Sequence, residues 1–178
     1  MEVRRVVTGH DAQGKSVFVS DETVDPVTLA LLPGAEFHQL WARDATASIP
    51  EDTTTTPRPS YFPAPDGFRF GFFTLGPESV ASPGDIDIER ALQELSQKLP
   101  GMAEVMEPEH PGMHTTDTID LDIVVSGEVW LELDDGAEVH LQAGDSVIQN
   151  GTRHAWHNRS SQPCTLAVAL VGATRTPA

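Results

Sequence analysis

A length of 178 residues suits one domain and is enough to bury a core without disulfide bonds or structural zinc. The 27 acidic residues outnumber the 11 basic ones and give a formal charge of −16, so the surface should repel nucleic acid and anionic membranes. The single cysteine, Cys164, excludes an intramolecular disulfide, and no run has the apolar length of a signal peptide core or a membrane span. We therefore expect a cytoplasmic protein with neither nucleic acid nor a membrane as a partner.

Short runs of strand-like residues dominate the first 67 residues, and the first two flank a turn-rich segment that is typical of a hairpin. The runs are residues 3–8, 16–20, 27–31 and 36–42. Residues 43–67 then lose all periodicity and are rich in proline, which predicts a long irregular loop. Such a loop is either a lid over a pocket or a surface excursion, and we favour the excursion.

The remaining residues, 68–178, predict further strands and one helix. A strand is expected over residues 68–73, and a helix over residues 86–99, where four apolar residues recur at helical spacing. These are Ile88, Leu92, Leu95 and Leu99. From residue 113 to residue 171 the sequence alternates between strands and turns such as Asp134–Gly136. Many short strands with one short helix predict an antiparallel all-β fold rather than a parallel α/β sheet.

Two polar clusters stand out among these strands. In the first, alternate residues from 114 to 120 are polar, and alternate residues of a strand share one face. They are His114, Thr116, Thr118 and Asp120. In the second, the same rule puts His154, Trp156 and Asn158 on one face and turns His157 to the other. The sequence therefore predicts a pocket wall that carries imidazoles, hydroxyls and a carboxylate.

The two clusters resemble the two motifs of the cupin superfamily. The first motif, commonly G-x5-H-x-H-x(3,4)-E-x6-G, corresponds to His114-x-Thr116-x3-Asp120-x6-Gly127. The second, commonly G-x5-P-x-G-x2-H-x3-N, corresponds to Gly151-x2-His154-x3-Asn158. The chain departs from the family where Thr116 replaces the second histidine and Asp120 replaces the glutamate. Further departures are Pro108 and Gln149 at the positions of a glycine and a proline, and Gly144, one place closer than expected.

The resemblance implies an antiparallel double-stranded β-helix, the jelly-roll barrel of cupins, with N-terminal strands and one short helix. It covers residues 68–171 well and the first 67 residues loosely. We therefore expect residues 1–67 to pack as strands and an irregular loop on a barrel formed by residues 68–178, within one structural domain. Cupin barrels commonly pair through N-terminal strands, so the resemblance also implies a homodimer.

The resemblance further implies a candidate metal site. Carried over residue by residue, it makes His114, Asp120 and His154 the ligands of a divalent transition metal, which could be Fe, Mn, Ni or Zn. Thr116 would then leave a coordination position for water or substrate. The alternative is a metal-free pocket, in which His114 and Asp120 are hydrogen-bonded partners and His114 or His154 serves as a general base.

Two classes of function follow from this pocket. The first is an enzyme that acts on a small carbonyl or aromatic compound by decarboxylation, isomerisation, dehydration or dioxygenation. Its substrate would contact Thr116, Thr118, Gln149 and Trp156. The second is a module that binds a small ligand without chemistry. The remaining histidines are expected outside the site: His140 should face outward, and His110 is kept only as a substitute ligand because of its nearness to His114 in sequence.

Overall fold

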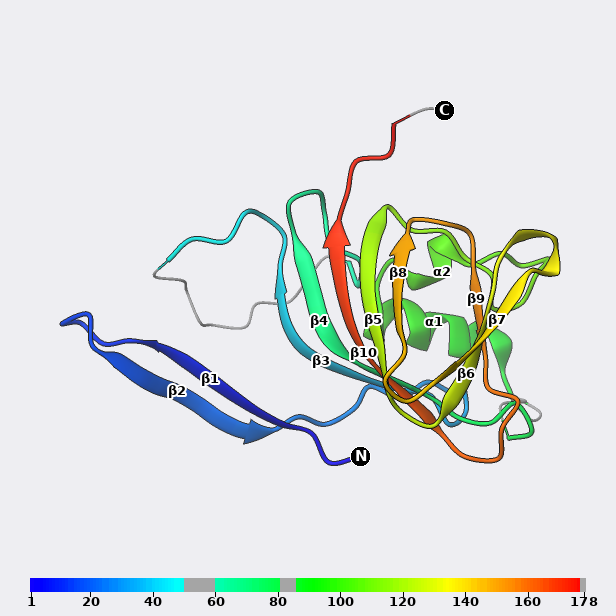
Figure 1. The fold of residues 1–178 in the computed structure, drawn as a ribbon, viewed down its shortest axis with the longest axis horizontal. Coiled ribbons are helices and arrows are strands. Elements are labelled where there is room, and N and C mark those ends of the chain that lie inside the picture. Colours follow the sequence, from blue (N-terminus) through cyan, green and yellow to red (C-terminus); the bar gives the residue numbers. More distant parts are fainter. Residues whose placement is uncertain (50–59, 81–85, 177–178) are drawn as a thin grey trace.

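The computed structural model describes residues 1–49, 60–80 and 86–176, and its strands are antiparallel throughout this part of the chain (Figure 1). The strands are β1 (Arg4–His10), β2 (Ser16–Thr23), β3 (Glu36–Arg43), β4 (Phe68–Leu75), β5 (Thr118–Ser126), β6 (Glu128–Glu132), β7 (Glu138–Gln142), β8 (Ser146–Asn150), β9 (Ala155–His157) and β10 (Cys164–Gly172). They form sheets with the orders β1-β2, β3-β4-β10-β5-β8 and β7-β6-β9. The antiparallel all-β fold expected from the sequence is confirmed, although the described strands form separate sheets rather than one continuous closed sheet.

The five-stranded and three-stranded sheets pack their apolar faces against each other. Along β5, alternate residues are buried. Val124 of β5 lies opposite Leu166 of β10, and Leu166 in turn lies opposite Phe73 of β4. Val129 and Leu131 of β6 meet this row from the other sheet in one cluster of buried residues. The two-residue period of the strands thus puts one face of each sheet into a shared core.

The expected helix is confirmed as α1 (Ile88–Lys98), which begins where Asp87 accepts a hydrogen bond from the Arg90 backbone at 3.1 Å. Its buried face differs from the predicted one, because Ile88 and Leu92 are exposed while Ala91 and Leu95 are buried. With α2 (Met102–Val105), the helix packs against the apolar face that carries Phe37 of β3. No helix in the described residues is long and apolar enough to cross a membrane.

The expected N-terminal hairpin is confirmed as β1 and β2, which project away from the rest of the molecule (Figure 1). Near its base, Arg5 donates a hydrogen bond at 2.7 Å to the Leu40 carbonyl of β3. The strand β3 also lies within the first 67 residues, yet it pairs with β4 in the large sheet. The N-terminal part therefore supplies an edge of the main sheet, and the boundary at residue 67 stays a prediction.

Candidate functional site

A cavity of about 160 Å³ lies over the inner face of the large sheet and is bordered by α2, β9 and the segments beside them. Its wall is mostly apolar and aromatic, with a small number of ionisable side chains. The lining residues are Leu32, Phe37, Tyr61, Phe62, Phe73, Leu75, Met102, Met106, Gly112, His114, Asp120, Asp122, His154, Trp156, Leu166, Val168 and Leu170. An apolar hollow with a few convergent polar groups is the usual form of a small-molecule site.

The structure brings His114 and His154 into contact across this cavity. Their backbones form an isolated bridge, in which the N–H of each donates to the carbonyl of the other at 3.0 Å. As a result the two rings lie with their centroids 4.2 Å apart and their planes inclined by 50°. Residues 40 positions apart in the sequence thus become one imidazole pair.

Both imidazoles have one nitrogen held by the backbone. His114 Nδ1 lies 3.0 Å from the Gly112 carbonyl, and His154 Nδ1 lies 3.0 Å from the Thr152 carbonyl. A carbonyl oxygen only accepts, so each Nδ1 carries the hydrogen and each neutral ring keeps its lone pair on Nε2. Burial lowers the pKa of both rings, to about 4 for His154, where the neighbouring His114 adds to the effect. The pair therefore presents two neutral rings, each with an Nε2 lone pair that can accept a hydrogen bond or a proton.

Two carboxyls from β5 complete the polar part of the cavity. Asp120 and Asp122 share the inner face of the strand and are 6 % and 5 % exposed. Burial raises the pKa of Asp120 to about 6, and burial together with the charge of Asp120 raises that of Asp122 to about 7. The Oδ1 atom of Asp120 is buried without a hydrogen-bond partner in the described structure. Such an atom is costly in a core that serves only stability.

Tyr61 and Phe62 form an aromatic wall of the cavity and come from the segment that was expected to be a surface excursion. The ring of Tyr61 stands edge-on to those of Phe37 and Phe62, at centroid distances of 6.0 and 5.1 Å. The pKa of Tyr61 is raised, mainly by burial. The end of the proline-rich loop thus belongs to the pocket. Residues 50–59 of the loop lie outside the described residues, so the alternative that the loop is a lid stays a prediction.

The buried Arg69 of β4 fixes this wall. Its guanidinium donates to the carbonyls of Ser60 and Tyr61 at 3.0 Å each, and it also bonds the Asp44 carboxylate. Arginine is well suited to this position because its planar head offers five donors in a fixed arrangement. One side chain therefore satisfies several backbone carbonyls that would otherwise be buried without partners.

Three of the predicted substrate-binding residues lie apart from the cavity, and the fourth lines it. The structure brings Trp156 to the cavity wall together with His114, Asp120 and His154, but Thr116, Thr118 and Gln149 do not line it. The hydroxyls of Thr116 and Thr118 bond each other at 2.8 Å, and the Gln149 amide donates to the Thr152 carbonyl at 3.4 Å. Their substrate-binding role stays a prediction.

The prediction that residues 114–120 form one strand is wrong. The strand β5 begins at Thr118, and Asp117 forms a bend before it. His114 is positioned instead by its bridge to His154, which alternation along a single strand cannot predict. Asp122 is a further cavity residue that the motifs do not include, although its place two residues after Asp120 puts it on the same face of the strand. Tyr61 gave no signal, because it follows an aperiodic segment.

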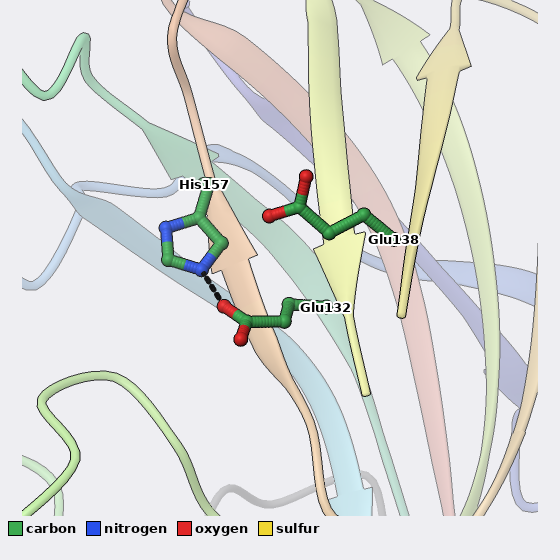
Figure 2. Close-up of side chains that lie close together, drawn as sticks. All are labelled: Glu132, Glu138 and His157. Atoms are coloured by element: carbon green, nitrogen blue, oxygen red, sulfur yellow. Dashed lines mark hydrogen bonds and ion pairs between the residues drawn. The ribbon is translucent and has the colours of Figure 1, made fainter. Parts of the chain in front are cut away.

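A second group of ionisable residues lies on the outer face of the β7-β6-β9 sheet, where Glu132, Glu138 and His157 point toward one another (Figure 2). The potential ligand atoms of these three residues lie within 4.8 Å of one another. Among the described residues, His114, Asp120 and His154 do not come that close together. The His157 nitrogens contact Glu78 and Glu132 at 2.8 and 2.7 Å, and Glu138 pairs with Arg159. These contacts describe a network of surface ion pairs.

His140 and Asn158 both lie outside the cavity lining, and His140 faces outward as expected. His140 stacks on Trp130 and bonds Glu128 at 2.8 Å. Asn158 is fully buried and donates to the carbonyls of Leu75 and Gln162, each at 2.8 Å. Asn158 therefore ties β4 to the turn before β10, which is a structural role.

Comparison with known proteins points to one family, the cupins. A cupin-domain family model matches residues 102–171. A phomopsin biosynthesis cluster protein C' of Diaporthe leptostromiformis is 31% identical over 157 residues, which are 88% of this chain and 70% of that protein. A cupin-domain-containing oxidoreductase of Neurospora crassa is 26% identical over 163 residues, 89% of this chain and 67% of that protein. The polyketide cyclase RemF from Streptomyces resistomycificus aligns with a TM-score of 0.46 at 16% identity, over 86% of this chain and 77% of that one.

The family model and the relative that is 31% identical show that the chain belongs to the cupin family. The prediction that the chain is a cupin is thereby confirmed.

Removing the buried carboxyl of Asp122 should change how stability depends on pH. Its pKa is about 7 in the folded protein against 3.8 for the free group, so the wild type loses stability as pH rises from about 4 to about 7. The Asp122→Asn variant cannot lose a proton there. We expect its free energy of unfolding, relative to wild type, to rise by a few kcal/mol over that range. Urea denaturation at several pH values measures this.

The exposed Glu2→Gln variant is the control for this experiment, and its difference from wild type should stay constant over the same range. A difference between Asp122→Asn and wild type that does not change with pH would show that burial of this carboxyl leaves its proton affinity unaltered.

Proposed function

We propose that this cupin is an enzyme that isomerises or dehydrates a small carbonyl or aromatic compound by proton transfer inside the cavity. The observation that carries the proposal is the convergence of two imidazoles and two carboxyls on one apolar hollow. The relatives support the processing of small molecules, since one is named for a biosynthesis cluster and another as an oxidoreductase.

In this proposal His154 is the general base. Its Nδ1–H is held by the Thr152 carbonyl, so Nε2 is free to take a proton from the carbon next to a substrate carbonyl. A carboxyl on β5, Asp120 or Asp122, gives a proton to the carbonyl oxygen, so that an enol forms and the total charge of the site is conserved. Reversal at another carbon completes an isomerisation, and loss of a hydroxyl as water completes a dehydration.

Solvent exchange of substrate hydrogens tests this chemistry without knowledge of the natural substrate. In D2O, proton NMR should show loss of the hydrogens beside the carbonyl in at least one member of a panel of small ketones and aldehydes, such as acetophenone and phenylacetaldehyde, faster than in buffer. We expect His154→Gln to slow this exchange by about 100-fold or more, the usual contribution of a general base.

The matched control is His140→Gln, because His140 lies on the outer face of the sheet away from the cavity and its loss should leave exchange unchanged. Binding of panel members without any exchange above the buffer rate would contradict the enzyme and support the alternative, a module that binds a small ligand without chemistry.

A second candidate function uses a metal in the same cavity. The buried and unpartnered Oδ1 of Asp120 and the free Nε2 atoms of two neutral imidazoles are the kinds of donor that Fe, Mn, Ni or Zn accept in proteins. His114, Asp120 and His154 would hold the metal after a movement that brings their ligand atoms closer. Such a metal would polarise a substrate carbonyl as a Lewis acid.

Metal analysis of purified protein tests this second candidate, with the outer-face histidine as the control. We expect stoichiometric transition metal in the wild type, loss of it in His114→Ala and His154→Ala, and retention of it in His157→Ala. Loss in His157→Ala alone would assign the metal to the outer group of Glu132, Glu138 and His157 and contradict a cavity metal.

We also propose that the chain forms a homodimer through its N-terminal hairpin. Phe18 at the hairpin is 79% exposed, and a groove between the hairpin and β3 is lined by Leu40, Trp41 and Phe70, among others. Because β3 is an edge strand of the large sheet, a partner's hairpin would cover both this edge and the apolar groove.

Light scattering at micromolar concentration should therefore give twice the mass of one chain, and Phe18→Asp should reduce it toward one chain. Ile88→Asp is the matched control, since Ile88 is also an exposed apolar residue but lies on α1. A wild-type protein with the mass of a single chain would contradict the dimer.

A further inference from the structure

The charge of the cavity wall limits what the site can bind. The ionisable residues of the wall are two carboxyls, two imidazoles and one phenol, and none of the described residues that line the cavity is a lysine or arginine. The carboxyls of Asp120 and Asp122 lie on the same face of β5, two residues apart, so their negative charges repel each other. A bound anion would add a third negative group to this face.

Arg69 is a buried cation on the same face of the sheet, but its hydrogen-bond donors are already used within the protein. Arg69 is opposite Leu170, which in turn is opposite Asp120, so the three residues form one row across β4, β10 and β5. Every nitrogen of its guanidinium donates to protein oxygens. The acceptors are the carbonyls of Arg43, Ser60, Tyr61, Phe62 and Phe68 and the carboxylate of Asp44. Arg69 therefore cannot bind a ligand in the cavity without breaking the hydrogen bonds that hold the Tyr61 segment in place.

Arg153, which precedes His154 in the sequence, is also fully engaged in ion pairs with other residues. Its guanidinium contacts both carboxylate oxygens of Glu107 at 2.7 Å and Asp134 at 3.0 Å. These bonds hold it at the outer surface beside α2 and the Asp134–Gly136 turn. An anion in the cavity would thus meet carboxyls without a compensating positive charge, an arrangement whose desolvation cost is large.

The dimensions of the cavity set the size of the ligand. Its volume of about 160 Å³ is close to the roughly 150 Å³ of an apolar cavity that holds one benzene molecule. The rings of Phe37, Tyr61 and Phe73 line it, with Phe37 and Phe73 stacked at 5.0 Å. Flat aromatic surfaces favour the faces and edges of another ring.

From this geometry we propose that the cavity takes an uncharged compound about one ring in size, which directs its polar group toward Asp120 and Asp122. Carboxylates, phosphates and sulfonates of the same size are excluded. The inference names the substrate class of the site and rests on the proposed function for its catalytic meaning, but the selectivity itself is a property of binding.

A pair of probes that differ in charge and hardly in shape tests the selectivity. Benzamide and benzoate have the same number of heavy atoms, and their dissociation constants can be measured by ligand-observed NMR at pH 8 and low salt. We expect wild-type protein to bind benzamide at least tenfold more tightly than benzoate. In Asp120→Asn/Asp122→Asn, where both carboxyls become amides of the same size, this ratio should fall at least threefold.

The control is Glu2→Gln/Glu89→Gln, which removes the same two charges from exposed positions and should leave the ratio unchanged. If the double cavity variant does not fold, Asp122→Asn alone gives the same comparison. Benzoate binding equal to or tighter than benzamide binding would overturn the inference, as would failure of both probes to bind in the millimolar range. Selective benzamide binding without hydrogen exchange in any carbonyl compound would instead overturn the proposed enzyme and leave the inference standing.

Discussion

The pairing of β5 with β10 is the constraint on which the site depends. In this register Asp120 lies opposite Leu170 and Asp122 opposite Val168, so the two carboxyls enter the interior on the same face as the apolar residues of β10. A shift by one residue would move both carboxyls to solvent and bring Ile119, Leu121 and Ile123 inward, a more apolar core. The chain thus buries two acids where apolar residues were available to it, which is typical of a site that is maintained at some cost in stability.

The polar groups around the cavity differ in how many of their hydrogen-bonding atoms have a partner. Arg69 has all its nitrogens bonded and Asn158 is bonded on both its amide nitrogen and its oxygen, while Asp120 keeps a buried oxygen without a partner. The satisfied groups hold the wall segment and the turn before β10, whereas the unsatisfied one faces the cavity. Well-bonded support around a buried carboxyl with an unpaired oxygen is the arrangement expected of a preorganised site.

Histidines are held in two different ways on the two faces of the small sheet. On the outer face, the two ring nitrogens of His157 contact the carboxylates of Glu78 and Glu132. Inside, His114 and His154 are held by backbone carbonyls in an apolar surrounding, which favours their neutral form and lowers their pKa. The same residue type therefore contacts surface carboxylates on one face and presents a neutral nitrogen with a free lone pair to the cavity.

The sequence by itself determined the antiparallel all-β fold, the position of α1 and the inner face of β5, because these follow from periods of two and of about 3.6 residues that are local properties of the chain. It also indicated His154 and Asp120 as candidate site residues through their motif positions. Only the tertiary structure decided that His114 meets His154 through a backbone bridge, that Thr116 and Gln149 lie away from the cavity, and that Tyr61 lines it. These depend on contacts between segments far apart in the chain, and the position of Tyr61 depends on Arg69, whose bonds to the backbone leave no pattern in the sequence.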